Sequence, residues 1–125
     1  MSSEENARLR IAVVGACASG KSTLVIALKA AGYEARHVAQ EHSYVPEMWQ
    51  LISRPDVLVY LDVAYETIQS RRSLAQFRPA DLAEQNRRLE HAREHCDLYL
   101  NTNDLNRDQV QDECLLFLDK LQHSG

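Results

Sequence analysis

The stretch Arg10-Ile-Ala-Val-Val-Gly15-Ala-Cys-Ala-Ser-Gly20-Lys21-Ser22-Thr-Leu24 contains the strongest pattern in this chain. An apolar run comes first, a loop bounded by two glycines follows it, and a segment rich in alanine and leucine comes after the loop. The loop has the spacing G-x-x-x-x-G-K-S, which is typical of a phosphate-binding loop between a strand and a helix. The stretch therefore predicts an α/β protein whose first strand leads into a ligand site.

The residue types in this loop explain why it would bind phosphate. Gly15 and Gly20 let the main chain curl so that successive N–H groups point at phosphate oxygens. Lys21 adds a cation that reaches the β- and γ-phosphates, and Ser22 offers a hydroxyl to Mg²⁺. The helix that begins at about residue 21 directs its positive end at the same phosphates. We expect the phosphates to contact Gly15, Ala16, Cys17, Ala18, Ser19, Gly20, Lys21, Ser22 and Thr23.

Length and composition limit what the rest of the chain can be. With 125 residues, 45% of them hydrophobic, the chain can bury one core, which predicts a single domain over 1–125 with a polar lead-in at 1–8. The net charge of −4 argues against a general nucleic-acid-binding protein. The chain shows no membrane-spanning run and no signal peptide, which predicts no membrane association. The cysteines are few and far apart, as in a reduced, cytoplasmic protein.

Apolar patterning predicts a short parallel sheet of about four strands flanked by helices. The first strand, at 9–14, is almost continuously apolar, as in a strand that is buried on both faces. The second, at 33–39, is interrupted by charged residues and is expected near an edge of the sheet. Further strands are expected at 57–61 and 97–100, and helices at 21–31, 46–52, 65–76, 79–96 and 106–122.

Two acidic residues follow predicted strands. Glu41 comes after the second strand, between Gln40 and His42, and Asp62 ends the third. Open α/β sheets bind ligands at the carboxyl ends of their strands, so Gln40, Glu41 and His42 would face the phosphates if their strand runs parallel to the first. An apolar strand that ends in aspartate also fits the residue that holds a Mg²⁺-bound water in nucleotide hydrolases. Both acids are candidates for a catalytic or Mg²⁺-binding role.

Arginines are concentrated between residues 71 and 93 of this acidic chain. One interpretation is a solvated helical face that is held by pairs such as Glu84 with Arg88. The other is a mobile cationic lid over the transferring phosphates, because the guanidinium group matches phosphate oxygens. The candidates for the lid are Arg71, Arg72 and Arg78.

Two shorter patterns indicate other chemistry. His91-Ala-Arg-Glu94-His95 fits a zinc-peptidase pattern, although a polar helix end whose histidines lie near the negative pole is the alternative. Asn101 and Asp104 stand where GTPases carry a guanine-reading box, but the lysine of that box is missing. Turn chemistry at the exit of a strand is the alternative there.

Together these segments resemble the P-loop kinases of nucleosides, nucleotides and small metabolites. The resemblance is carried by residues 15–22, by residues 54–66 with Arg71 and Arg72, and by residues 96–105 with the closing helix. It implies the three-layer fold of P-loop NTPases, ATP as phosphoryl donor, Mg²⁺, a lid arginine and an acceptor site over the carboxyl edge of the sheet. The chain departs from these kinases in size, since one strand and most of the acceptor-binding insertion are missing.

The favoured interpretation is an ATP- and Mg²⁺-binding, kinase-like phosphotransferase with an unknown small-molecule acceptor, or an ATPase. A second is a non-catalytic nucleotide- or phosphate-binding module whose short sheet is completed by a second copy in a homodimer. A third is a GTPase-like switch that would prefer GTP to ATP. In the kinase-like interpretation, Lys21 binds the β/γ oxygens, Ser22 binds Mg²⁺ and Thr23 binds the α-phosphate. Glu41 is the general base or water-positioning group, Asp62 is the second candidate for that role, and either acid is a candidate for a further Mg²⁺ ligand. Arg71 or Arg72 stabilises the charge that develops during transfer.

Overall fold

The computed structural model of this protein describes residues 9–72 and 75–123, so the lead-in expected at residues 1–8 lies outside the described residues. Strands and helices alternate along most of the chain. Their order is β1 (Arg10–Gly15), α2 (Lys21–Ala30), β2 (Glu34–His37), the 3₁₀ helix η1 (Gln40–His42), α3 (Met48–Ser53), β3 (Val57–Asp62), α4 (Tyr65–Arg72), α5 (Pro79–Arg88), α6 (Glu90–His95), β4 (Leu98–Asn101) and α7 (Arg107–His123).

The strands form one four-stranded sheet in the order β2-β1-β3-β4, and each pair of neighbours is parallel. β1 lies inside the sheet, where Ile11 is aligned with Ala35 of β2 on one side and with Val57 of β3 on the other. The expected α/β fold with a short parallel sheet is therefore confirmed. β2 is an edge strand that buries only Ala35, as its charged residues predict.

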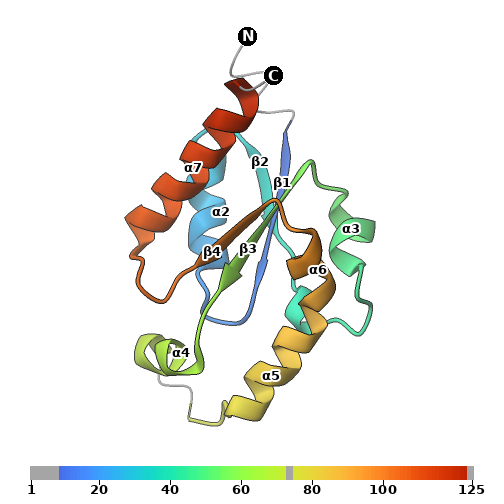
Figure 1. The fold of residues 1–125 in the computed structure, drawn as a ribbon, viewed down its shortest axis with the longest axis vertical. Helices are drawn as coiled ribbons and strands as arrows, with labels where there is room; N and C mark the ends of the chain where they lie inside the picture. Colours follow the sequence, from blue (N-terminus) through green and yellow to red (C-terminus); the bar gives the residue numbers. More distant parts are fainter. Residues whose placement is uncertain (1–8, 73–74, 124–125) are drawn as a thin grey trace.

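Helices cover both faces of the sheet, because the inner strands present apolar side chains to each face in turn. Ile11 and Val13 belong to a core shared with α2 and α7, whereas Ala12 and Val14 belong to a core shared with α3, α5 and α6. The two groups of helices lie on opposite sides of the sheet, and α4 lies near the carboxyl ends of the strands (Figure 1). This three-layer arrangement leaves that edge of the sheet for a site.

The helix expected at 65–76 is shorter in the structure. It is α4, which ends at Arg72, and residues 75–76 form a turn. Residues 73–74, which the expected helix includes, lie outside the described residues. The next helix begins at Pro79, whose fixed φ suits the first turn of a helix.

The single helix expected at 79–96 is wrong, because the chain bends at Leu89 and forms α5 and α6 instead. The N–H of Leu89 is shared between the carbonyl oxygens of Gln85, at 3.0 Å, and Asn86, at 3.2 Å. The side chain of Leu89 is fully buried against the sheet. No glycine or proline stands at the bend, so the sequence carries no sign of it.

Candidate functional site

The loop between β1 and α2 begins with a glycine that has no room for a side chain. A Cβ atom on Gly15 would lie 2.4 Å from the carbonyl oxygen of Leu61 in β3 and 2.7 Å from Oγ of Ser19. Gly20 precedes α2 with a φ of 100°, a left-handed conformation that glycine adopts readily. Ala18 is also left-handed, with a φ of 60°, which costs a residue with a side chain about 1–2 kcal/mol.

The start of α2 presents unpaired backbone N–H groups. The N-cap residue is Gly20, which has no side chain to cap the helix. Nearby, Ser19 donates to the carbonyl oxygen of Ala16 at 3.2 Å, and Leu24 donates to that of Gly20 at 3.1 Å. The remaining donors and the positive helix end form a site that suits an anion. Within residues 9–72 and 75–123, no partner is found for the N–H groups of Ala18, Gly20, Lys21, Ser22 and Thr23.

The side chain of Lys21 folds back onto the loop. Its Nζ donates to the carbonyl oxygens of Gly15, at 2.7 Å, and Ala16, at 3.1 Å, and to Oε2 of Glu41 at 2.8 Å. The Lys21 and Glu41 side chains are only 10% and 6% exposed. Because β2 runs parallel to β1, the segment that follows it brings Glu41 to the loop, as the sequence predicts. Each of these buried charges has the other as its partner.

Two buried oxygen atoms beside the loop have no partner in the described part of the chain: Oε1 of Glu41 and Oγ of Ser19. Buried polar atoms are nearly always hydrogen-bonded, so an exception indicates a bound water, ion or ligand. Lys21 bonds only to the other oxygen of the carboxylate, and Nε2 of His42 lies 3.8 Å from that same oxygen. Oε1 of Glu41 therefore remains able to accept a hydrogen bond or a proton.

Asp62 ends β3 as expected, but its carboxylate is engaged on the side of β4. Oδ1 accepts the N–H of Val63 at 3.0 Å, and Oδ2 accepts the hydroxyl of Tyr99. Burial, together with the bond to Asp62 and its charge, raises the pKa of Tyr99 to about 12. Among the described residues, no bond joins Asp62 to Lys21 or Glu41. The structure thus brings Glu41, and not Asp62, to Lys21.

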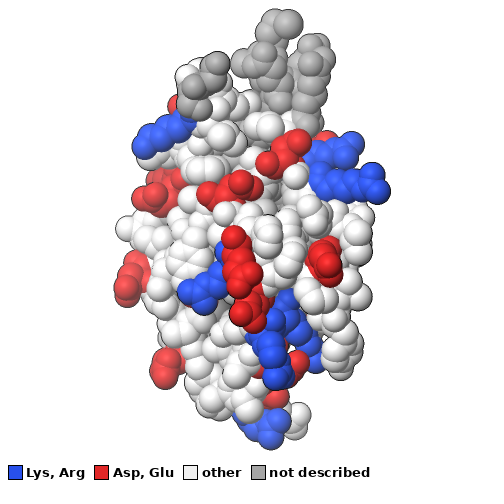
Figure 2. All heavy atoms as spheres, turned by 45° about the vertical axis from the view of Figure 1, so that its right-hand side comes forward, with Lys and Arg blue, Asp and Glu red and all other residues white. Residues whose placement is uncertain are grey.

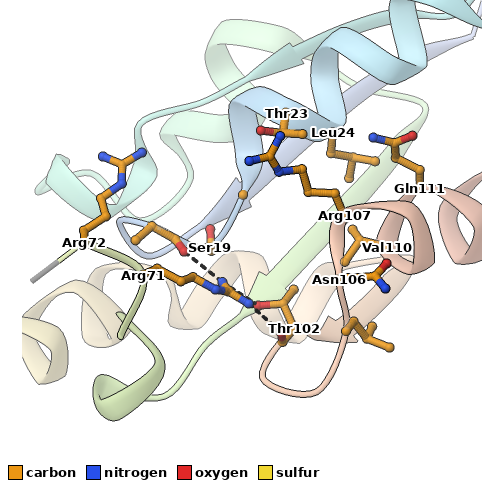
Figure 3. A pocket seen from close by; sticks show the side chains of 13 residues that line it. Ser19, Thr23, Leu24, Arg71, Arg72, Thr102, Asn106, Arg107, Val110 and Gln111 are labelled. Atoms are coloured by element: carbon orange, nitrogen blue, oxygen red, sulfur yellow. Dashed lines mark hydrogen bonds between the residues drawn. The ribbon is translucent and has the colours of Figure 1, made fainter. Parts of the chain in front are cut away.

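Arg71 joins the loop to the turn after β4. Its guanidinium donates to the carbonyl oxygens of Ala18, at 2.9 Å, and Thr102, at 2.6 Å (Figure 3). These residues form one side of a cavity of about 470 Å³, and Arg107 of α7 reaches toward Thr23 on its other side. The lining residues are Ala18, Ser19, Gly20, Thr23, Leu24, Arg71, Arg72, Thr102, Leu105, Asn106, Arg107, Val110 and Gln111.

Three further arginines of this region are candidates for the lid or lie on the exposed face: Arg72, Arg78 and Arg87. Arg72 lines the cavity, but its guanidinium points away from that of Arg71 (Figure 3). Arg78 and Arg87 pair with acidic residues of α5, as in the solvated helical face that the sequence allows. On the face shown in Figure 2, acidic and basic side chains are intermixed. No helix in the described ranges combines the length and the apolar character that crossing a membrane requires.

Gln40 is expected from the sequence to face the phosphates beside Glu41, but its side chain is buried against α3 and α5 instead. Its fully buried side chain accepts the N–H of Trp49 at 2.8 Å and donates to the carbonyl oxygen of Val45 at 2.8 Å. Its Nε2 also donates to the carbonyl oxygen of Arg88 at 3.3 Å. These bonds fix the segment that carries Glu41 between the sheet and two helices. A single polar residue after a strand gives no sequence-level sign of this role.

A second glutamine contacts the loop directly. Oε1 of Gln85, in α5, accepts the N–H of Cys17 at 3.1 Å. Gln85 stands between Leu82 and Leu89 on the buried side of its helix. The sequence gives one indication that Gln85 has a partner, because a polar residue at an apolar position of a helix needs a hydrogen bond when it is buried. The sequence does not show which partner it is.

The histidine pair of α6 makes structural contacts. Nδ1 of His91 accepts the indole N–H of Trp49 at 3.1 Å, and the ring of His95 stacks on that of His91 with centroids 4.2 Å apart. In neutral His91 the ring hydrogen is then on Nε2, which leaves that atom no lone pair for a metal. Among the described residues, no three or more histidine, cysteine, aspartate or glutamate side chains are grouped to hold a metal. These contacts favour the helix-end interpretation over zinc.

Asn101 and Asn103 form a turn at the exit of β4. Oδ1 of Asn101 accepts the N–H of Asn103 at 3.0 Å, and Oδ1 of Asn103 accepts the N–H of Ala64 at 2.7 Å. This is the turn chemistry that the sequence offers as the alternative to a guanine-reading box.

The carboxyl edge of the sheet thus collects a loop with free amides, the Lys21–Glu41 pair, Arg71 and a cavity. No protein-family model matches this chain, and no curated protein matches its sequence.

Proposed function

We propose that this protein binds ATP with Mg²⁺ at residues 15–23 and transfers or hydrolyses the terminal phosphoryl group, as a small kinase-like P-loop protein. The observation that carries this proposal is the row of free N–H groups at the start of α2, with the ammonium group of Lys21 beside it. A hydrogen bond to a charged oxygen contributes about 1.5–3 kcal/mol, so several together support tight binding of a polyphosphate. Helix N-termini of this kind bind phosphate groups.

The cavity beside the loop supports a nucleoside in addition to the phosphates. Its volume of about 470 Å³ lies in the range of small-molecule sites. Leu24 and Val110 offer apolar contacts to a flat base, and the side-chain amide of Gln111 offers donor and acceptor groups. These polar groups suit adenine and guanine alike, so they do not select one base. Competition between ATP and GTP therefore tests the GTPase-like alternative.

The residues of the site fit a Mg²⁺ ion. The side chain of Ser22 is exposed in the first turn of α2, and Oε1 of Glu41 is without a partner in the described chain. Mg²⁺ takes oxygen ligands, keeps several of its waters and needs only one or two protein ligands when phosphates complete the set. When bound, the ion neutralises negative charge on the phosphates. Asp62 is the weaker candidate, because Tyr99 engages its carboxylate.

The chain's own groups then have separate roles. Lys21 exchanges its bonds to the loop carbonyls for bonds to phosphate oxygens. Glu41 holds Lys21 in the free protein, and its other oxygen has one of two roles: it is a ligand of Mg²⁺, or it is the base that accepts the proton of an acceptor hydroxyl or a water. Arg71, already bonded to the loop, stabilises the charge that develops during transfer, with Arg72 as the alternative.

A non-catalytic binding module is the second candidate, and the Lys21–Glu41 ion pair favours it. In this candidate Lys21 stays bonded to Glu41 and to the loop carbonyls after the polyphosphate binds, and binding occurs without turnover. In this candidate a second copy extends the sheet at β2 or β4, since both are edge strands. Sedimentation equilibrium tests the homodimer, and a monomer at all concentrations would contradict it.

Binding and turnover measured on the same variants separate the two candidates. We expect Glu41→Gln to bind Mg-ATP nearly as the wild type does and to release ADP about 10²–10⁴-fold more slowly. Glu47→Gln is the matched control, because Glu47 is an exposed acid in the following segment. Wild-type binding without ADP release would favour the module. If the wild type binds neither ATP, GTP nor pyrophosphate, the proposal is wrong.

A further inference from the structure

The contact between α5 and the loop is made by a polar side chain in an apolar setting. Gln85 is 8% exposed, and its neighbours on the same side of α5 are Leu82, 7% exposed, and Leu89, 0% exposed. A buried amide destabilises the folded protein unless it is hydrogen-bonded. Its bond from the N–H of Cys17 supplies that partner and joins residues that are far apart in the sequence.

The bonded N–H group stands next to the strained residue of the loop. Ala18, which follows Cys17, has a φ of 60°. A residue with a side chain keeps such a conformation only where its surroundings determine it. Here the N–H of Cys17 is held by Gln85, and the carbonyl oxygen of Ala18 is held by Arg71 at 2.9 Å. The strained turn is thus fixed from two helices, α5 and α4.

The end of α5 is itself anchored beside the site. Arg88 donates from Nη1 to the carbonyl oxygen of Glu41 at 3.4 Å, and its own carbonyl oxygen accepts from Gln40 at 3.3 Å. The helix that carries Gln85 therefore contacts the loop and also the segment that holds Glu41. This arrangement keeps the Gln85 amide in register with Cys17.

We propose that Gln85 is a positioning residue for polyphosphate binding: its side chain holds the Cys17 N–H, fixes the left-handed turn at Ala18 and so presets the free N–H groups that follow. The proposal rests on the proposed function, because those N–H groups are the ones assigned to the phosphates. Without Gln85 the loop samples more conformations, and ordering it on binding lowers the affinity.

Amide hydrogen exchange, followed by NMR, tests the contact without any ligand. Gln85→Met keeps the length of the side chain and removes the acceptor oxygen, so we expect the Cys17 N–H to exchange about tenfold faster or more. Gln85→Glu keeps an acceptor oxygen and should leave this exchange close to that of the wild type. Equal exchange in the wild type and Gln85→Met would overturn the proposal.

Calorimetric titration with Mg-ATP and with pyrophosphate tests the consequence. We expect Gln85→Met to weaken both ligands about five- to tenfold, whereas Gln50→Met, at an exposed glutamine of α3, should change neither. The double variant Ala18→Gly/Gln85→Met should bind both ligands at least twofold more tightly than Gln85→Met alone, because glycine adopts the left-handed turn without strain. A role confined to supporting the fold would give no such rescue.

The outcomes separate this proposal from the proposed function. If the wild type binds neither Mg-ATP nor pyrophosphate, both proposals are overturned. If the wild type binds and Gln85→Met binds equally well, only the role of Gln85 is overturned. Weaker binding by Gln85→Met with rescue by Ala18→Gly supports the proposal.

Discussion

Lys21 forms a salt bridge of 2.8 Å with Glu41, and both side chains are almost fully buried. Removing one partner of a buried ion pair leaves a charge without compensation and costs about 3–5 kcal/mol, whereas replacing both partners leaves no such charge. The pair therefore contributes to the fold of the loop and also holds the lysine that we assign to the phosphates. The contribution of the pair to stability can be measured separately from its effect on phosphate binding.

We expect Lys21→Met to lower the free energy of unfolding by about 3 kcal/mol. The double variant Lys21→Met/Glu41→Gln should lose less than Lys21→Met alone, because it buries no unpaired carboxylate. Urea denaturation of the wild type, the two single variants and the double variant gives the coupling energy. Lys29→Met, at an exposed lysine of the same helix, is the control. Effects that simply add would contradict a coupled pair.

Buried thiol and phenol groups also link stability to alkaline pH, and Cys114 and Tyr99 are two of them. Burial raises the pKa of the Cys114 thiol from 9.0 to about 12, and burial followed by the bond to Asp62 raises that of Tyr99 from 10.0 to about 12. Above pH 9 the unfolded chain begins to lose these protons while the folded protein keeps them, which favours unfolding. Their contribution to stability is therefore complete below pH 9 and is lost as the pH rises toward about 12.

Urea denaturation at pH 8 and pH 11 measures this loss. The wild type should lose stability between the two conditions, and Cys114→Ala and Tyr99→Phe should each lose less, since each lacks one of the titrating groups. Equal losses in all three proteins would show that these groups are not the cause.

The glycines of the loop serve different elements. Gly15 ends β1, where a Cβ atom would meet the backbone of β3 at 2.4 Å, whereas no atom of the described residues lies within 4 Å of a Cβ atom on Gly20. Gly15→Ala must therefore separate two central strands or distort the loop, and we expect a loss of about 1–3 kcal/mol or more. Gly20→Ala costs only the left-handed backbone before α2, about 1–2 kcal/mol. Thermal unfolding of the two variants tests whether Gly15→Ala loses more stability than Gly20→Ala. A larger loss of stability for Gly20→Ala would contradict this prediction.

The elements that could be predicted from the sequence are those with a local cause. β1 and α2 follow from an apolar run, two glycines and helical spacing, and the charges of β2 indicate an edge strand. The bend at Leu89 has no local cause, because apolar residues continue at helical spacing through it. It arises where the buried leucine packs against the sheet.

At the scale of the whole molecule, the parallel sheet decides which residues meet. The sequence placed Glu41 correctly because the carboxyl ends of parallel strands share one edge. It did not predict the bond between Cys17 and Gln85, nor the bond between Arg71 and Thr102, because both depend on how helices dock across the sheet. The same reasoning named Asp62 as a candidate, although packing directs its carboxylate to Tyr99.

Ligand binding should stabilise the whole fold. A ligand at a hundred times its Kd adds about 2.7 kcal/mol to the free energy of unfolding. We expect Mg-ATP to raise the melting temperature more than pyrophosphate does at equal concentration, because the cavity beside the loop adds contacts to the base. Equal shifts for the two ligands would show that the cavity does not take part.

The central claim is that the free amides at the start of α2 bind a polyphosphate, and an NMR titration of ¹⁵N-labelled protein with Mg-ATP tests it most directly. The account predicts that the largest shifts of N–H resonances occur at Ala18, Gly20, Lys21, Ser22 and Thr23, and that Lys29→Met leaves them unchanged. Resonances of these amides that stay in place at saturating Mg-ATP, or a largest shift elsewhere in the chain, would contradict it.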